Sequence, residues 1–349
     1  MITRFAVFLI LFFCGKASFG QLGGDVAFPF VFNAPSPRCM ALGGTAITQK
    51  NRDLGLTYQN PALLDGQLHN KQLQISYSNF IEGSYMHMAY VSYATEVPKI
   101  GQMAGHIFVT DYAKLQGFDE TGLPIGEFNA TDYVFKISNA QKLNENLRIG
   151  GSVIFLYSAY ERYVATAFGL DAAVLYSKKE KNIDAGLVIR NLGYNAIPYD
   201  EIRTGLPFEI MVSASKKLEH NPLRLTIIGR NLQKWDLTYQ ENLNENQEID
   251  LSTGEVIKKE ATFLEKGMRH IGLSAEFLFS ENFHLIFAYN HQRRKEMALS
   301  VRGGFTGFSW GLSINVRKYQ ITFANGGYFL GKNAKYFSIQ KKLSDFSKH

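Results

Sequence analysis

The chain has 349 residues, and its 37 Lys and Arg exceed its 31 Asp and Glu to give a formal net charge of +6. Only 19% of the residues are charged while 13% are aromatic, which excludes a disordered chain, a collagen and a coiled coil. Two cysteines are too few for a cysteine-based metal site or a disulfide scaffold. No apolar run is long enough for a membrane-spanning helix. The small net charge and the scattered basic residues argue against nucleic-acid binding.

The first twenty residues have the pattern of a secretory signal peptide. Arg4 provides the positive start, the run from Phe5 to Phe13 provides the apolar core, and Ser18-Phe19-Gly20 provides a small-x-small cleavage site. Acylation at Cys14 is the alternative, which the bulky residue before it disfavours. We therefore predict a signal peptide over 1–20 that is cleaved near Gly20.

Residues 21–70 form a region rich in Gly and Pro without strand alternation. The pair Gly43-Gly44 and the run Asn60-Pro61-Ala62 are its most distinctive motifs. Irregular backbone of this kind is tolerated in a membrane protein either outside the bilayer or inside a barrel lumen, where other parts of the protein form hydrogen bonds with its backbone groups. We therefore expect residues 21–70 to form an N-terminal plug or hatch segment, with Gly43, Gly44, Asn60, Pro61 and Ala62 as its motif residues.

From about residue 71 to the end, the chain alternates apolar and polar residues. Between Phe308 and Arg317, large apolar residues occupy one parity while Ser, Gly, Asn and Arg occupy the other. The same sorting recurs from Leu147 to Ser158 and over 183–190. This pattern predicts strands with one apolar and one polar face. Further segments of this type lie at 73–77, 133–137, 208–212, 223–227, 271–279, 285–289 and 319–323.

Strand length favours a transmembrane barrel over a secreted sandwich. Tilted spanning strands need about 9 to 11 residues, which the segments 147–158 and 307–317 supply. We therefore predict an all-β fold, with residues 71–349 forming a transmembrane antiparallel β-barrel of about 14 strands in a bacterial outer membrane. The apolar parity, for example Leu312, is expected to face lipid, and the polar parity, for example Ser313, is expected to face the lumen.

Two polar stretches are expected outside the membrane. Residues 233–266 form a long polar connection with a hairpin tip at 252–255, either a disordered loop or a partner-binding one, in which Trp235, Leu237 and Tyr239 are the candidate contact residues. The basic run 291–295 is expected to be a solvated turn that meets lipopolysaccharide headgroups.

Matches to catalytic motifs are weak. Gly307 to Gly311 fits the nucleophile-elbow pattern, but the strand alternation continues through Val316 where the elbow needs a helix. Ser213 and Ser338 each begin an S-x-x-K pattern, but both lie at strand ends rather than at a helix start. The eight histidines have no metal-ligand spacing, and the chain has no glycine-rich phosphate-binding motif. We therefore predict no catalytic residue, no metal and no cofactor.

Four stretches together resemble a known family. The Ala-Leu-Gly-Gly run ending at Gly44 and the Tyr-Gln-Asn-Pro-Ala run ending at Ala62 resemble the hatch region of FadL-like fourteen-stranded barrels, in the PorV/PorQ family of type IX secretion. The segments 206–210, 216–224 and 231–237 look like the PorQ branch of that family. The resemblance covers most of the chain that follows the predicted signal peptide.

This resemblance implies a non-enzymatic membrane component of a cell-surface attachment complex. Such a barrel anchors a PorZ-like surface protein, in a complex where a sortase-like PorU, held by PorV, attaches cargo proteins to lipopolysaccharide. A FadL-like channel for hydrophobic small molecules and a PorV-like carrier of secreted substrates are the alternatives. An inward-facing apolar stripe near a strand kink would favour the channel. Because the inward parity is expected to carry Gly, Ser, Asn and Arg, we rank the anchor above the channel and the channel above the carrier.

Overall fold

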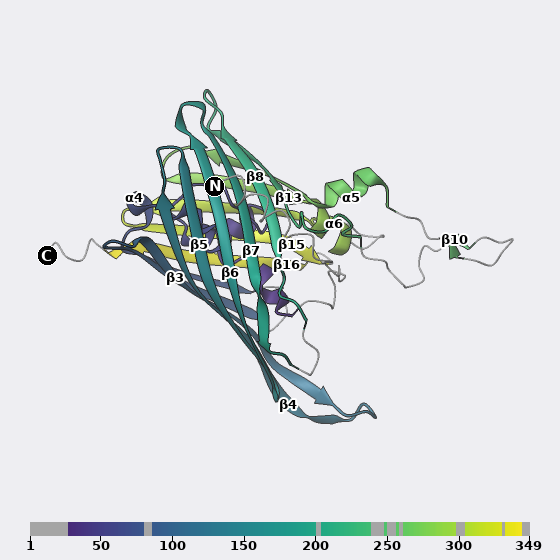
Figure 1. Ribbon diagram of the computed structural model, residues 1–349. Coiled ribbons are helices and arrows are strands. Elements are labelled where there is room, and N and C mark those ends of the chain that lie inside the picture. The colour runs from purple at the N-terminus through teal and green to yellow at the C-terminus, as the bar shows by residue number, and fades with distance from the viewer. Residues whose placement is uncertain are drawn as a thin grey trace, which may run out of the picture.

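The computed structural model describes residues 27–79, 86–199, 204–238, 248–249, 256–257, 261–297, 304–329 and 332–343. It shows a barrel of long strands with an N-terminal portion of the chain inside it, and with small helices and a long hairpin at one end (Figure 1). The predicted signal peptide at 1–20 lies outside the described residues and stays a prediction.

Fourteen of the described strands pair antiparallel in one closed sheet, which confirms the predicted barrel and its strand number. Strand β1 pairs with β2 on one side and with β16 on the other, so the described wall has no free edge. The closed strands are β1 (Gln72–Asn79), β2 (His87–Val97), β3 (Gly101–Phe118), β4 (Pro124–Lys142), β5 (Leu147–Tyr160), β6 (Tyr163–Lys178), β7 (Ile183–Ile197), β8 (Glu209–Lys217), β9 (Leu223–Gly229), β12 (Ile271–Leu278), β13 (Phe283–Asn290), β14 (Phe308–Val316), β15 (Tyr319–Phe329) and β16 (Lys332–Lys342).

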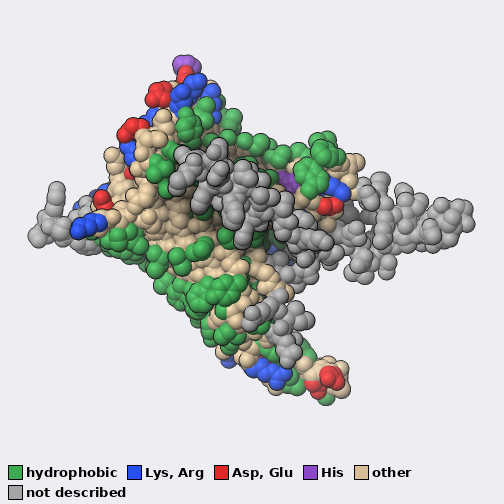
Figure 2. Space-filling model, in the orientation of Figure 1, with side chains coloured by type: hydrophobic (Ala, Val, Ile, Leu, Met, Phe, Trp, Pro, Cys, Tyr) green, Lys and Arg blue, Asp and Glu red, His purple; other side chains and the backbone are tan. Residues whose placement is uncertain are grey.

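The apolar parity of the strands faces outward, as predicted. In β14, Phe308, Trp310 and Val316 are exposed, whereas Ser309 and Ser313 are buried in the interior. Figure 2 shows hydrophobic side chains along the visible barrel wall and charged side chains gathered toward its ends. An apolar outer band with charged ends is the surface that a bilayer requires of a barrel.

The two ends of the barrel differ in their connections. One end carries the short connections 98–100, 143–146, 179–182, 218–222, 279–282 and 317–318, and we call it the turn end. The other end carries the longer connections, including 198–208, 230–270 and 291–307, and we call it the loop end. The last described strand, β16, ends at the turn end, where Lys341 is opposite Tyr319, and Figure 1 shows the small helices α5 and α6 at the other end.

Residues 27–69 form short helices inside the barrel, and we call them the interior segment. Proline occupies an early position of three of these helices, and Ser36, Asp53, Asn60 and Asp65 each accept a backbone hydrogen bond at a helix start. The helices are η1 (Pro29–Phe32), α2 (Pro37–Ala41), α3 (Leu54–Gln59), η2 (Pro61–Leu63) and α4 (Gly66–His69). Every residue over 34–49 and 53–64 is buried.

The loop end contains helices that the sequence patterns did not predict. Helix α5 (Phe263–Arg269) ends the long polar connection, and β10 (Glu248–Ile249) pairs with β11 (Val256–Ile257) on either side of the predicted hairpin tip, which itself lies outside the described residues. Helix α6 (His291–Met297) replaces the solvated turn expected at 291–295, so that expectation was wrong. A seven-residue helix spans only two turns, too few for its periodicity to stand out.

The three weak matches to catalytic motifs fall on strands β8, β14 and β16. None of the helices in the described ranges is long and apolar enough to cross a membrane.

Candidate functional site: the interior segment and the crevice beside it

The interior segment crosses the barrel from one wall to another. Helix α2 packs against β13, β14, β15 and β16, and η2 packs against β4, β5 and β6. Helix α3 lies between them and contacts β2 and β4. The segment therefore touches most of the barrel circumference and occupies the path along its axis.

The two sequence motifs of this segment lie together. The Gln59 side chain donates a hydrogen bond to the carbonyl oxygen of Gly44 at 2.8 Å and accepts one from the backbone N–H of Ala46 at 2.7 Å. The next residue, Asn60, donates to the carbonyl of Ile47 at 2.6 Å and accepts from the N–H of Ala62 at 2.9 Å. Gly43 and Gly44 both have φ near +90°, a conformation that favours glycine. The two motifs are therefore joined to each other by side-chain hydrogen bonds of Gln59 and Asn60.

Inward-facing glycines of the wall let these motifs approach closely. A Cβ atom added at Gly150 of β5 would lie 2.4 Å from the backbone nitrogen of Ala62 and 2.6 Å from the carbonyl carbon of Pro61. On the opposite wall, a Cβ added at Gly311 would lie 2.5 Å from the Cβ of Ala41. The glycines on the inward parity are therefore places where interior backbone meets the wall.

Buried ion pairs surround the interior segment. Arg38 of α2 pairs with Glu276 of β12, which also accepts from Arg224 at 3.0 Å. Lys136 of β4 pairs with Asp171 of β6 and donates to the backbone carbonyl of Tyr58 in α3. In a low-dielectric interior such pairs hold two parts of a structure together, because separating them leaves a buried charge. The Arg38–Glu276 pair therefore fixes α2 to the wall, and the Lys136–Asp171 pair positions the ammonium that fixes α3.

A third group of charges lies nearer the loop end. Glu209 at the start of β8 accepts hydrogen bonds from Arg190 of β7 at 2.9 Å and from Arg230 after β9 at 3.0 Å. The Arg190 guanidinium also lies over the ring of Phe32, 5.7 Å from its centroid. This group joins neighbouring strands to the first helix of the interior segment.

Aromatic side chains link the segment to β2 and β3. The ring of Tyr58 lies edge-on to Tyr90, His106 and Phe108, with centroids 5.8 to 6.1 Å apart. The Tyr90 hydroxyl contacts Nδ1 of His106 at 2.8 Å and donates to the carbonyl of Leu54 at 3.1 Å. These contacts order the wall beside a crevice.

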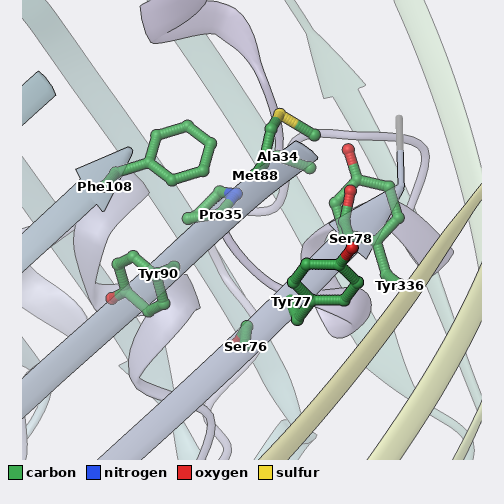
Figure 3. A pocket seen from close by; sticks show the side chains of 9 residues that line it. All are labelled: Ala34, Pro35, Ser76, Tyr77, Ser78, Met88, Tyr90, Phe108 and Tyr336. Carbon is green, nitrogen blue, oxygen red and sulfur yellow. The ribbon is translucent and has the colours of Figure 1, made fainter. Parts of the chain in front are cut away.

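The crevice lies between the interior segment and the first strands. Figure 3 shows its lining, with Ala34 and Pro35 from the segment, Met88 and Tyr90 from β2, and Phe108 from β3. The remaining lining residues are Ser76, Tyr77, Ser78 and Tyr336. Apolar and aromatic walls with a few hydroxyl groups are typical of sites for small hydrophobic ligands. In this structure the crevice leaves no room for a water molecule, so it is closed.

The inward face is more apolar than the sequence analysis expected. The expected Ser, Gly, Asn and Arg are present, but Met88, Phe108, Leu156 and Met211 are also inward and at most 2% exposed. These side chains pack against apolar residues of the interior segment in one cluster. The pairing of β3 with β4 is also interrupted between Asp111 and Lys114. The expectation that the inward parity carries Gly, Ser, Asn and Arg was therefore incomplete, because a filled lumen also buries apolar side chains on the inward face of the strands.

The three candidate contact residues after β9 differ in position. The ring of Trp235 is half exposed and lies against Phe263 of α5, with centroids 4.9 Å apart, and against His270. Leu237 is 3% exposed, so it is not available to a partner in this structure. Tyr239 lies outside the described residues.

One ion pair fixes α5 to the segment that contains Trp235. The Lys266 ammonium donates to the Asp236 carboxylate at 2.7 Å and holds the pKa of that carboxyl well below its usual range. We infer that this part of the long connection is an ordered cap at the loop end.

A long hairpin at the loop end was missed by sequence reasoning. Strand β2 pairs with β3 only as far as Asp111, and β5 pairs with β4 only from Ala130, so β3 and β4 continue over 112–129 as a two-stranded ribbon (Figure 1). Its tip exposes Phe118, Leu123 and Ile125 by 60 to 65%. The sequence patterns predicted a strand only over 133–137 in this part of the chain, so they gave no sign of the ribbon.

The fold is similar to that of solved outer-membrane channels. The toluene transporter TbuX of Ralstonia pickettii superposes with a TM-score of 0.55 at 11% identity, over 90% of this chain and 99% of that one. The monoaromatic hydrocarbon channel CymD gives 0.54 at 11% identity, over 89% and 98%. A deletion mutant of the monoaromatic hydrocarbon channel TodX gives 0.50 at 11% identity, over 89% and 97%.

No protein-family model and no curated protein sequence matches the chain. At these identities the structural likeness shows a FadL-like barrel fold, the fold of outer-membrane proteins. The finer resemblance to the PorV/PorQ family stays a prediction.

Proposed function

We propose that this chain is an outer-membrane channel for hydrophobic small molecules and that its interior segment is the gate. The observation that carries the proposal is the crevice of Figure 3, whose apolar and aromatic lining joins the segment to an inward apolar stripe on the wall. An inward stripe of this kind near an interrupted strand is the feature that separates a channel from an anchor. The solved proteins of the same fold that are described as transporting toluene or monoaromatic hydrocarbons add support by analogy.

Passage through the barrel requires movement of the interior segment, because its residues fill the axis. The Arg38–Glu276 ion pair and the hydrogen bond from Lys136 to the Tyr58 carbonyl hold the segment against the wall when the barrel is closed. A hydrophobic ligand that enters the crevice would compete with the contacts of Ala34 and Pro35. The transported class would be small and apolar, since the crevice has no charged lining residue.

Enlarging the crevice tests this function. Met88→Ala removes a side chain that lines it, whereas Met211→Ala removes a methionine that is equally buried in β8 but does not line it. Both changes cost core packing, about 2 to 5 kcal/mol. We expect faster uptake of toluene into cells or liposomes only for Met88→Ala. Equal uptake by both variants would contradict the crevice as the route.

An anchor for a surface partner is the second candidate, and a different observation favours it. The ribbon over 112–129 extends past the barrel wall, and the ion pair between Lys114 and Glu127 at 3.2 Å marks its sides as water-exposed. A two-stranded ribbon is marginally stable alone, and three large exposed apolar side chains at its tip suit a protein contact. On this reading the ribbon would hold a PorZ-like protein in an attachment complex with PorU and PorV at the lipopolysaccharide surface.

The anchor has its own test. The triple variant Phe118→Ser, Leu123→Ser and Ile125→Ser should leave the barrel folded and release the partner from solubilised membranes. The control is Ile100→Ser with Leu143→Ser, which removes exposed apolar side chains at the turn end. Copurification of the same partner with both variants would exclude the ribbon as its contact.

A further inference from the structure

A second cavity lies at the turn end, away from the crevice. It has a volume of about 220 Å³ and is lined by residues of the interior segment, the β14–β15 turn and the adjoining ends of β1 and β16. Five of the lining residues are cationic: Arg52, Arg317, Lys318, Lys341 and Lys342. Among the described lining residues there is no carboxylate.

The pairing of the strands explains why these cations meet. Tyr319 is opposite Lys341 and Gln320 is opposite Gln340 in the β15–β16 register, and Gln72 is opposite Lys342 in the β1–β16 register. Arg52 joins them from inside because its backbone carbonyl accepts a hydrogen bond from the Gln72 side chain. Five like charges around one cavity repel one another, and a bound anion would offset that repulsion.

The cavity also contains an unpartnered buried acceptor. The Gln340 amide donates to Gln320, and Gln320 donates to Ser313 at 2.7 Å. The N–H donors of both glutamines are therefore used in hydrogen bonds inside the barrel. The Oε1 atom of Gln340 is buried and accepts no hydrogen bond among the described residues. A ligand that carries a hydroxyl or N–H donor as well as negative charge would satisfy this atom if it entered between Gln340 and the cationic side chains.

The cavity lies across the rim of the barrel. Lys341 and Tyr319 belong to the outward parity, and the Lys341 ammonium lies over the Tyr319 ring and donates to its hydroxyl at 3.2 Å. Gln320 and Gln340 belong to the inward parity and are buried. An amphipathic Lys–Tyr pair at the end of a membrane strand lies at headgroup depth, so a lipid phosphate and a soluble phosphate can both reach the cavity.

We propose that this cavity binds a hydroxyl-bearing phosphate, such as the glycerophosphate headgroup of phosphatidylglycerol or a soluble glycerol phosphate. The arginine guanidinium groups match phosphate oxygens in geometry, and the lysines add charge. A phosphate held there contacts Arg52 of the interior segment and Arg317 of the wall at once. Binding would therefore tie the segment to the rim.

The test measures the temperature at which the purified full-length barrel loses its compact gel migration. Phosphatidylglycerol and glycerol 3-phosphate are added separately, with phosphatidylcholine and inorganic phosphate as comparisons. The variant is Arg317→Glu with Lys318→Glu, and the control is Lys179→Glu with Lys181→Glu in another turn of the same end.

We expect stabilisation by at least one of the two glycerophosphates, with apparent affinity roughly tenfold weaker in the Arg317→Glu, Lys318→Glu variant and unchanged in the control. Stabilisation by phosphatidylglycerol alone assigns the lipid source, and stabilisation by glycerol 3-phosphate alone assigns the soluble source. No stabilisation by either, or equal stabilisation of both charge variants, would overturn the site. An equal effect of inorganic phosphate would overturn the requirement for the glycerol hydroxyl groups.

Discussion

Replacing Asp171 with Asn is expected to destabilise the folded barrel by about 3 to 5 kcal/mol. Asp171 and Lys136 form an ion pair whose side chains are at most 3% exposed, and the other Asp171 oxygen accepts the backbone N–H of Asn191 at 2.8 Å. The amide keeps an acceptor for Asn191 but leaves the Lys136 charge buried without a counter-charge. The measurement is unfolding in urea, followed by the shift in gel migration.

A compensating change separates charge from packing. The double variant Lys136→Met with Asp171→Asn removes both charges, so it should recover most of the lost stability. Glu127→Gln is the surface control, because its pair with Lys114 is solvent-exposed and is worth about 0 to 1 kcal/mol. A double variant as unstable as Asp171→Asn would show that the buried charge is not the cause.

Placing Arg at the centre of the outer wall is expected to cost about 2 to 4 kcal/mol. Val153 lies midway along β5, is 59% exposed, and faces outward beside Ile137 and Leu170 on the neighbouring strands. Val153→Arg would put a charge into the lipid core of the bilayer. The readout is the yield of folded, membrane-inserted protein and its unfolding midpoint in lipid vesicles.

The control for this change is Leu143→Arg. Leu143 is similarly exposed but lies in the turn between β4 and β5, where an added charge meets water. Ser313, which the sequence pattern places in the lumen, does not serve as a second control, because it is buried and hydrogen-bonded to Gln320 and Thr322. Equal losses for Val153→Arg and Leu143→Arg would contradict the assignment of the outer wall to lipid.

The barrel was predictable because period-two alternation indicates both that a segment forms a strand and which of its side chains face outward. Phe308 and Trp310 face outward and Ser309 faces inward, as their parity indicates. The strand number also followed, since short turns such as 144–146 separate the alternating runs. Both properties depend on local order along the chain.

The contents of the lumen were not predictable in the same way. The parity of a strand residue indicates only which face of the strand it occupies, and Leu156 and Met211 occupy the inward face. Whether an inward apolar residue contacts water or protein depends on the distant residues 27–69. The partner of a buried charge is equally non-local, as Arg38 and Glu276 are 238 residues apart. The inward glycines, such as Gly150, carried a usable signal, because a strand glycine often marks a close backbone approach.

The most direct test of the gate joins the interior segment to the wall by a disulfide. Thr48 of the segment and Ser213 of β8 are buried with their hydroxyl oxygens 3.2 Å apart, so Thr48→Cys with Ser213→Cys places two thiols within bonding reach.

The measurement is toluene uptake by liposomes that contain this double variant, before and after reduction. If the interior segment is a gate, uptake is low in the oxidised protein and returns on reduction, while the gel migration of the folded barrel does not change. Equal uptake in the oxidised and reduced states would contradict the gate and leave the anchor as the function to test.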